Sequence, residues 1–483
     1  MRAASRPVIR PKPSNQKFDT TPGPLPCFSF HYYPEIFMKL FLTCLLATAA
    51  VPTFAQTTIQ ARKADRFVDS LGINVHMEYA NTPYNNYAMI NRRLRELGMR
   101  HFRDEINDTN PSFVGELQQI GKMGYSLCGL IEGGNDYPPL GTTLEPSAVV
   151  PMIQNLEPAI EAVEEPDEPD DGGFVYDGVS YPQGAINESK DLWHIVQSNS
   201  EISALPVLVM SEGNAQDYTQ LAAITHPPID YATYGNMHAY QGGGIGDRLL
   251  TSWYMPYSRD LTGSELLWTT EMGYHNNTHF LSDGEQQGVS QRASAIYLPI
   301  AFLSGFERGM LQTFSYELID EAYDPNFTSG SGEGHYGLLN YDGSAKPAYT
   351  ALKNFIALLR DPGAKQFEPR SLTVTFSGAP STMRYALLEK SNGDNCLALW
   401  NDVRVYDLAW QTSSGMIVPG RDIYPANVPV TLTFSSAKDL LVYAPNDASG
   451  VRPTGAYTIA KDPFSISLSL PPKVLLLKIS DGN

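Results

Sequence analysis

The sequence predicts an α/β fold class, a (β/α)8 TIM barrel followed by a small all-β sandwich. From about residue 66 to 360, short apolar runs alternate with amphipathic helical patterns, which is typical of repeated β-α units around a parallel sheet. After Asp361-Pro362-Gly363, short β-branched and aromatic runs separated by turn residues indicate the sandwich. The 483 residues are 42% hydrophobic, which is enough for packed cores and excludes a disordered chain or a coiled coil.

Eight apolar runs are the strand candidates of the barrel: residues 71–75, 99–103, 125–131, 158–163, 206–210, 231–238, 265–270 and 310–316. Helix candidates lie between or after them, at residues 87–97, 111–123, 184–198, 245–259, 285–303 and 346–359. Eight strands within about 295 residues fit a barrel, for which about 250 residues is typical. A doubly wound sheet is the alternative, but residues 72–76, Gly-Ile-Asn-Val-His, are not the glycine-rich phosphate turn expected after its first strand.

The N-terminal residues predict an export signal. Residues 38–55 combine a basic residue, an apolar run and small residues before Gln56, which is the pattern of a secretory signal peptide. Because such signals begin a chain, we expect Met38 to be the true start and residues 1–37 to be an upstream extension. The barrel would then occupy residues 56–362 and the sandwich residues 363–483, and the protein would be secreted or periplasmic.

Charge and cysteine content restrict the partners. The net charge of −18 and the lack of a basic patch exclude nucleic acid as a partner. No apolar run reaches the roughly 18 residues of a membrane span.

Cys128 and Cys396 fall in different predicted domains, so two separate buried thiols are favoured over a disulfide. Without CxxC or HExxH we expect no metal and no cofactor, although the acidic residues 164–171 could form a loose cation site. We expect a monomer.

Polar residues follow most of the predicted strands, at the end of a barrel where active sites are built. Two glutamates, Glu165 after strand 4 and Glu271 after strand 7, would face each other across the mouth, as retaining glycoside hydrolysis requires. The candidate substrate-binding residues at the other strand ends are Asn74, His76, Arg103, Glu164, His238, Tyr240 and Tyr316. His76 and His238 could alternatively be satisfied core histidines.

Several strand-end motifs carry a family resemblance. They are residues 159–167 (Ala-Ile-Glu-Ala-Val-Glu-Glu-Pro-Asp), 234–240 (Tyr-Gly-Asn-Met-His-Ala-Tyr), 267–274 (Leu-Trp-Thr-Thr-Glu-Met-Gly-Tyr) and 316–320 (Tyr-Glu-Leu-Ile-Asp), followed by Gly337-Leu-Leu and Lys346-Pro-Ala-Tyr. In this order and spacing the segment from about residue 66 to 360 resembles the clan A glycoside hydrolases, cellulase-like (β/α)8 families such as family 5 and family 39. The resemblance implies a retaining enzyme that cleaves β-glycosidic bonds of a carbohydrate substrate.

The resemblance also implies roles for individual residues. Glu165 would be the acid/base and Glu271 the nucleophile, Arg103 would steady the nucleophile, and His238 with Tyr240 would line the −1 sugar site.

One position departs from the clan pattern, which has asparagine where this chain has Glu164. We expect the carboxylate of Glu164 to lie beside Glu165 at the mouth and to contact the sugar. A second register would make Glu168 the acid. The alternative function is a carbohydrate-binding barrel without catalysis. We expect the sandwich to be a structural companion of the barrel.

Overall fold

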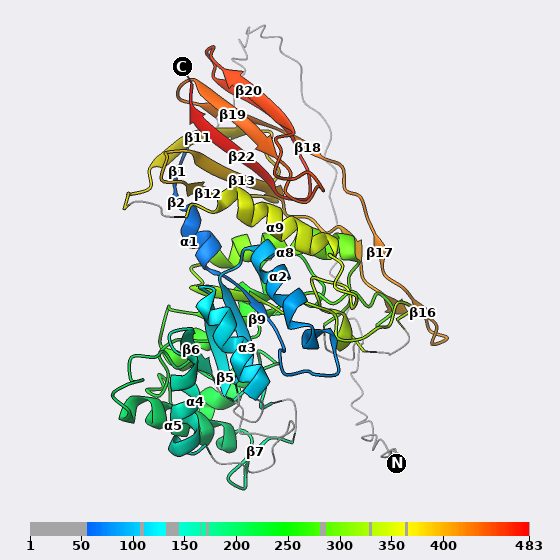
Figure 1. Ribbon diagram of the computed structural model, residues 1–483. Coiled ribbons are helices and arrows are strands. Elements are labelled where there is room, and N and C mark those ends of the chain that lie inside the picture. Colours follow the sequence, from blue (N-terminus) through cyan, green and yellow to red (C-terminus); the bar gives the residue numbers. More distant parts are fainter. Residues whose placement is uncertain are drawn as a thin grey trace, which may run out of the picture. The chain divides into compact units, whose positions relative to one another are not determined.

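The computed structural model describes residues 56–106, 111–131, 144–164, 166–170, 173–280, 286–327, 331–362 and 366–482. The predicted signal peptide and the extension before it lie outside the described residues and stay predictions. Glu165 also lies outside them. Figure 1 shows the helix-rich barrel at the lower end and the strand-rich sandwich at the upper end of the described residues.

Six parallel strands form the continuous part of the barrel, in the order β6-β5-β4-β3-β10-β9. Their bounds are β3 (Leu71–Asn74), β4 (His101–Ile106), β5 (Ser126–Ile131), β6 (Ile160–Glu164), β9 (Trp268–Met272) and β10 (Gln312–Ser315). Their residues are almost continuously buried, as expected of parallel strands covered on both faces. The strand β5 is the clearest apolar run among them, whereas β4 carries three charged or ionisable side chains, Arg103, Asp104 and Glu105, that are buried with it.

Two further segments close the sheet into a barrel through isolated parallel bridges. Val207 pairs with Val163 at the end of β6, Leu208 pairs with Tyr234, and Gly235 pairs with Leu267 beside β9. All eight predicted strand positions are therefore present, and the predicted barrel fold class is confirmed. The segments 206–210 and 231–238 make isolated bridges where regular strands were predicted.

Helices cover the outside of the barrel. They are α1 (Ala64–Asp69), α2 (Tyr87–Leu97), α3 (Pro111–Lys122), α4 (Pro146–Leu156), α5 (Gln183–Ser198), α6 (Asp217–Thr225), α7 (Met255–Thr262), α8 (Gln291–Glu307) and α9 (Pro347–Leu359). Asn86 caps the N-terminus of α2 by accepting a bond from the Met89 amide, and Gly98 ends the helix with φ 83°. The sequence did not predict α1, α4 or α6; α4 contains Pro151, which normally disrupts a helix interior.

The sandwich has two sheets. One is ordered β1-β11-β18-β21 and the other β2-β12-β13-β22-β19-β20. The bounds of the first are β1 (Thr57–Gln60), β11 (Ser371–Ser377), β18 (Val428–Phe434) and β21 (Ser465–Leu470). Those of the second are β2 (Arg62–Lys63), β12 (Met383–Glu389), β13 (Asn395–Asn401), β22 (Leu475–Asp481), β19 (Lys438–Tyr443) and β20 (Gly455–Ile459). The strands β1 and β2 precede the barrel in sequence, whereas we expected residues 56–362 to belong to the barrel alone.

The α8 helix joins the two domains. It is apolar on all sides and almost entirely buried, with α9 beside it. From the sandwich side the Val405 amide donates to the Tyr297 hydroxyl of α8 at 2.9 Å. Asn446 donates to the carbonyl of Ala295. These contacts support the expectation that the sandwich is a structural companion of the barrel, and Figure 1 shows α8 and α9 between the two.

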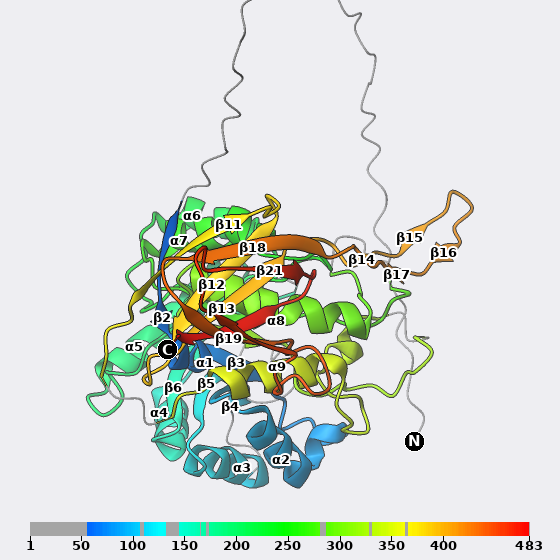
Figure 2. The same cartoon turned by 90° about the horizontal axis from the view of Figure 1, so that it is seen from above.

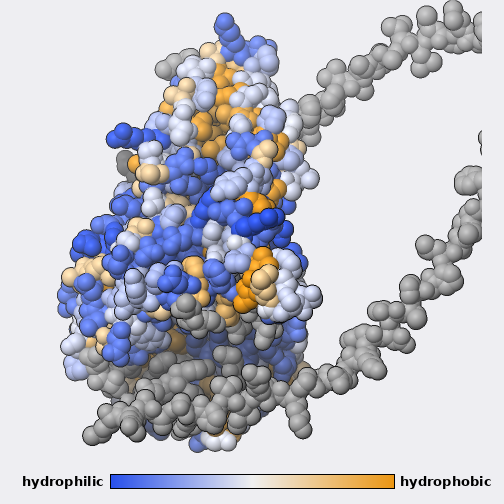
Figure 3. All heavy atoms as spheres, turned by 90° about the vertical axis from the view of Figure 1, so that its right-hand side faces the viewer, coloured by the Kyte–Doolittle hydropathy of each residue, from blue (hydrophilic) through white to orange (hydrophobic). Residues whose placement is uncertain are grey.

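A paired extension leaves the sandwich. It consists of β14 (Tyr406–Asp407) with β17 (Arg421–Asp422), and of β15 (Trp410–Gln411) with β16 (Ile417–Val418) at its tip. Figure 2 shows β15 and β16 projecting away from the other elements. On the face drawn in Figure 3, hydrophobic side chains gather mainly over the upper, strand-rich part, and most of the barrel part is hydrophilic. A further short hairpin, β7 (Val175–Tyr176) with β8 (Val179–Ser180), lies in the loop after β6.

Two predictions on cysteines and membranes can be compared with the structure. Cys128 and Cys396 are both free and buried, so the prediction of two separate thiols is confirmed. Among the described residues, no helix is long and apolar enough to cross a membrane.

Candidate active site

A cavity of about 1080 Å³ opens at the C-terminal ends of the barrel strands. Six predicted site residues line it: Asn74, His76, Arg103, Tyr240, Glu271 and Tyr316. The structure therefore brings together side chains from strands 1, 2, 6, 7 and 8, as the strand-end argument predicts. His238 is fully buried directly behind the wall, where it contacts side chains that line the cavity.

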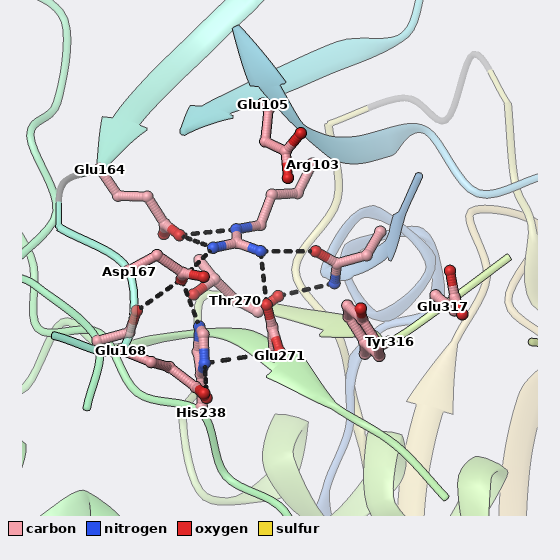
Figure 4. A network of polar contacts seen from close by, with 12 residues as sticks. Arg103, Glu105, Glu164, Asp167, Glu168, His238, Thr270, Glu271, Tyr316 and Glu317 are labelled. Carbon is pink, nitrogen blue, oxygen red and sulfur yellow. Dashed lines mark hydrogen bonds and ion pairs between the residues drawn. The ribbon is translucent and has the colours of Figure 1, made fainter. Parts of the chain in front are cut away.

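Arg103 is the centre of a network of carboxylates (Figure 4). It is 3% exposed, and its guanidinium donates to Glu164 Oε1 at 2.6 Å, to Asp167 Oδ1 at 2.6 Å and to Glu271 Oε1 at 2.7 Å. It also donates to Asn74 Oδ1 at 3.0 Å. Burial alone would lower the pKa of Arg103, but the three carboxylates raise it well above its ordinary value. The cation is thus permanently charged and fixes the position of Glu271.

Glu271 has donors on both of its carboxylate oxygens. Arg103 donates to Oε1, and the Tyr240 hydroxyl donates to Oε2 at 2.7 Å. The His238 ring also lies near, with Nδ1 3.5 Å from Oε2. Burial raises the pKa of Glu271 to about 7, against the opposing charges of His238 and Arg103. Around neutral pH this carboxylate can therefore be ionised, with its charge held by fixed donors.

The side chain of Glu164, at the end of β6, does not lie where the sequence predicted it. Its side chain is fully buried, and it accepts bonds from Arg103 and from Asn236 Nδ2 at 2.9 Å. It does not line the cavity, so the expectation of a sugar contact at the mouth is not met. The physical reason is electrostatic: the buried guanidinium of Arg103 attracts a carboxylate inside the barrel, where it needs a counter-charge.

Asp167 and Glu168 occupy the cavity wall after β6. Glu168 Oε1 lies 2.6 Å from His238 Nδ1, and a carboxylate oxygen of Glu168 lies within 4.8 Å of one of Glu271. Burial lowers the pKa of His238, but the charges of Glu271 and Asp167 and the bond with Glu168 outweigh burial and raise it to about 9. The pair of His238 and Glu168 therefore holds a proton at neutral pH. Glu165 lies outside the described residues, so its predicted place stays a prediction.

The opposite wall is built from strands 1, 2 and 8. The His76 ring stacks on Tyr79 with centroids 4.6 Å apart, and its nitrogens lie 3.7 Å from Glu105 and 3.8 Å from Glu317. Tyr316 donates to Glu333 Oε1 at 2.6 Å. This wall can hold sugar hydroxyl groups through carboxylates, imidazole and phenol.

Sequence reasoning missed several residues of the site. Asn236 accepts from the amide and hydroxyl of Thr270 and donates to Glu164, which ties strands 4, 6 and 7 together. It lies within the quoted motif 234–240, so its position beside His238 was a usable signal. Glu105 and Glu333 were not predicted either; Glu105 follows Arg103 by two residues and therefore shares its face of the strand.

Three groups of side chains in the described part of the chain are compact enough to hold a cation. They are His76 with Glu317 and Glu321, Glu164 with Asp167 and His238, and Glu168 with His238 and Glu271. In the second and third groups, Arg103 and protonated His238 already neutralise the carboxylates. The prediction that the protein uses no metal is not tested by these positions.

Glu212 lies behind the cavity with no exposed surface and predicts a pH-dependent stability. Burial, with the neighbouring charge of Asp170, raises the pKa of Glu212 to about 10. Between pH 5 and 9 the folded state keeps a proton that the unfolded state has lost, so stability falls as pH rises. Glu212→Gln cannot lose a proton, so it removes this dependence on pH. The unfolding free energy of the variant relative to the parent should therefore rise by up to about 1.4 kcal/mol per pH unit over this range.

The measurement is urea unfolding of parent and variant at pH 5, 7 and 9. Glu201→Gln, a change at an exposed carboxylate, is the control and should show a difference that does not vary with pH. A constant difference for Glu212→Gln as well would mean that Glu212 is ionised in the folded protein.

Comparison with known proteins finds similarity in structure only. No family model and no curated protein matches the sequence. A family 39 glycoside hydrolase from Bacteroides cellulosilyticus is 14% identical with a TM-score of 0.53, covering 87% of this chain and 83% of that one. A monomeric β-xylosidase from Caulobacter crescentus is 13% identical with a TM-score of 0.52, covering 87% of this chain and 98% of that one.

A glucosidase from Croceicoccus marinus shows a similar degree of likeness. It is 12% identical with a TM-score of 0.54, and the match covers 82% of this chain and 92% of the glucosidase. At such low identity these matches establish the fold, including a sandwich beside the barrel. The resemblance to clan A glycoside hydrolases, with family 39 as one of the families named, is thereby confirmed at the level of the fold: this chain has the fold of the family 39 glycoside hydrolases.

Proposed function

We propose that this protein is a retaining glycoside hydrolase that cleaves β-glycosidic bonds of an oligosaccharide or polysaccharide by double displacement. The observation that carries the proposal is the pair Glu168 and Glu271, which line the same cavity and have one carboxylate oxygen each within 4.8 Å of the other. Retaining enzymes hold their two carboxyl groups about 5 Å apart, whereas inverting enzymes need about 6.5–9.5 Å to admit a water molecule.

Glu271 is the nucleophile in this proposal. Its ionised carboxylate attacks the anomeric carbon while the bond from that carbon to the leaving oxygen breaks, and a glycosyl ester forms. Arg103 and Tyr240 donate to the two oxygens and fix the direction of attack. The strand-4 acid gives its proton to the leaving oxygen in this step. Because the negative charge on Glu271 disappears when the ester forms, the resulting strand-4 carboxylate is stable and can accept a proton from water in the second step.

The acid must donate a proton to the leaving oxygen and later take one from the attacking water. The position of Glu168, in the cavity wall and close to Glu271, supports this residue as the acid. His238 holds the carboxyl group in place through the 2.6 Å contact. Glu165, the residue that the family resemblance implies, stays the alternative because it lies outside the described residues.

The two acids can be distinguished by the leaving group. Glu168→Gln should lower kcat/KM by about 10²–10⁴-fold on a disaccharide, whose leaving group needs protonation. The same change should have little effect on a 2,4-dinitrophenyl glycoside, because that leaving group departs unprotonated. Added azide should restore turnover of Glu168→Gln and give a glycosyl azide of retained configuration, because the empty acid position admits the anion.

Glu165→Gln is the matched control, since it makes the same chemical change three residues away. If Glu165→Gln shows this leaving-group pattern and Glu168→Gln does not, Glu165 is the acid. A parent protein that binds oligosaccharides and hydrolyses none of the substrates would instead support the carbohydrate-binding barrel without catalysis.

The substrate and the compartment belong to the proposal as well. The structural neighbours include a β-xylosidase and a glucosidase, and we infer that β-xylosides and β-glucosides are the first substrates to test. The signal-like residues 38–55 support a secreted or periplasmic protein. N-terminal sequencing of the exported protein should give Gln56 as the first residue.

A further inference from the structure

We propose that Trp253 is the platform that binds a neutral sugar ring of the leaving group, on the side of the cavity next to the acid. This inference rests on the proposed function and deepens it, because it defines what the enzyme requires beyond the bond that it cleaves.

Trp253 is held outward at the cavity edge. It is 43% exposed although it is a large aromatic side chain, and it lines the cavity together with Leu249 and Tyr254. It belongs to a π-helical turn, Leu250–Tyr254, whose two end residues are buried in the hydrophobic core. Such turns are common at functional sites. The anchored ends fix the turn, so the indole stays available at the surface of the cavity.

The position of Trp253 relative to the acid shows that it lies on the leaving-group side of the cavity. Glu168 touches the loop after strand 5, since a Cβ added to Gly213 would lie 3.0 Å from the Glu168 carboxylate carbon. Gly213, Asp217 and Trp253 line the cavity together, from the loops after strands 5 and 6. Burial and the charge of Glu168 raise the pKa of Tyr254, the neighbour of Trp253. The acid protonates the leaving oxygen, so the leaving group must extend over these loops.

The opposite half of the cavity has a different character. It is formed by His76, Tyr79, Glu105, Tyr316 and Glu333, which are polar or hydrogen-bonded through their polar atoms. These groups suit the hydroxyl groups of the sugar that is transferred to Glu271. A flat, half-exposed apolar side chain suits instead the C–H face of a pyranose ring. Such a ring belongs to the leaving group, which never becomes covalently bound to the enzyme.

The charges beside Trp253 select against an acidic sugar. Asp170 is held by the backbone amides of Gly213 and Asn214 at 2.9 Å each, and Asp217 lines the same half. A uronate ring stacked on Trp253 would bring a third negative charge to this region. Neutral rings can instead donate their hydroxyl groups to these carboxylates.

The test compares substrates that do and do not fill this position. Trp253→Ala should lower kcat/KM on xylotriose or cellotriose by about tenfold or more. The same variant should change kcat/KM on the corresponding glycosyl fluoride less than about twofold, because fluoride is a single atom and reaches no platform. Trp253→Phe should recover most of the loss. The control is Trp410→Ala, an exposed tryptophan on β15 that does not line the cavity.

Equal losses on trisaccharide and fluoride, or no loss on either, would overturn the inference while leaving the glycosidase proposal intact. If the parent hydrolyses neither substrate, the proposed function fails, and the platform is then tested by calorimetric binding of the same trisaccharides. Tenfold weaker binding to Trp253→Ala than to Trp410→Ala supports the platform. Equal binding to the two variants, or no binding to the parent, contradicts it.

Discussion

Glu271→Gln should lower kcat by about 10⁴-fold or more on every substrate, including glycosides with activated leaving groups. Glutamine has nearly the same shape but cannot form the glycosyl ester. Its amide would also place a donor against either Arg103 or Tyr240, both of which already donate to this position. The measurement is initial-rate kinetics on a 2,4-dinitrophenyl β-xyloside and β-glucoside, with circular dichroism as the check of folding.

Glu265→Gln is the control for this substitution. Its side chain is 78% exposed and pairs with Arg259 before β9, outside the cavity. It should keep the activity of the parent. If Glu271→Gln retained more than a tenth of the parent kcat, Glu271 would not be the nucleophile, and the proposed mechanism would be wrong.

Arg103→Met should cost about 3–5 kcal/mol of unfolding free energy, because it leaves buried carboxylates without their cation. Glu164 is fully buried, and Glu271 and Asp167 face the same guanidinium. Removing one partner of a buried charge network exposes the full desolvation cost of the others. Urea unfolding at pH 7 measures the loss, and at lower pH the loss should shrink as the carboxylates become protonated.

Two further arginine variants make this result specific. Arg100 binds Asp65 and Asp69 with a side chain that is 32% exposed, so Arg100→Met should cost only about 1 kcal/mol or less. Arg103→Lys keeps a charge but cannot present several donors in one plane. It should therefore retain more stability than Arg103→Met and still lose turnover. Equal costs for Arg103→Met and Arg100→Met would contradict the network.

The barrel was predictable because its signal is local. Most strands are short runs that are buried on both faces, and the sequence shows this pattern directly at Leu127 to Ile131. Once the strands are located, their ends are located as well. This is why Arg103, Tyr240 and Glu271 could be predicted as site residues from the sequence. Their convergence on one cavity needs only the rule that parallel strands end on the same side.

The strand-4 turn could not be predicted in the same way. The chain has two Glu-Pro pairs here, at residues 165–166 and 168–169, and the family pattern favours the first because it directly follows the predicted strand. Which carboxylate enters the cavity depends on how far the strand continues before the turn. In the structure, Arg103 and Asn236 hold Glu164 inside the barrel from strands 2 and 6. Such contacts are distant in sequence and leave no local pattern.

The pairing of β1 and β2 with the sandwich has a consequence for biosynthesis. Thr58 pairs with Thr373, and Arg62 pairs with Leu388, so both strands await partners that are made more than three hundred residues later. Domains usually fold in the order of their synthesis. Here the sandwich cannot be completed until the ribosome has passed the whole barrel, and a chain truncated at residue 362 would present two unpaired edges to its neighbours.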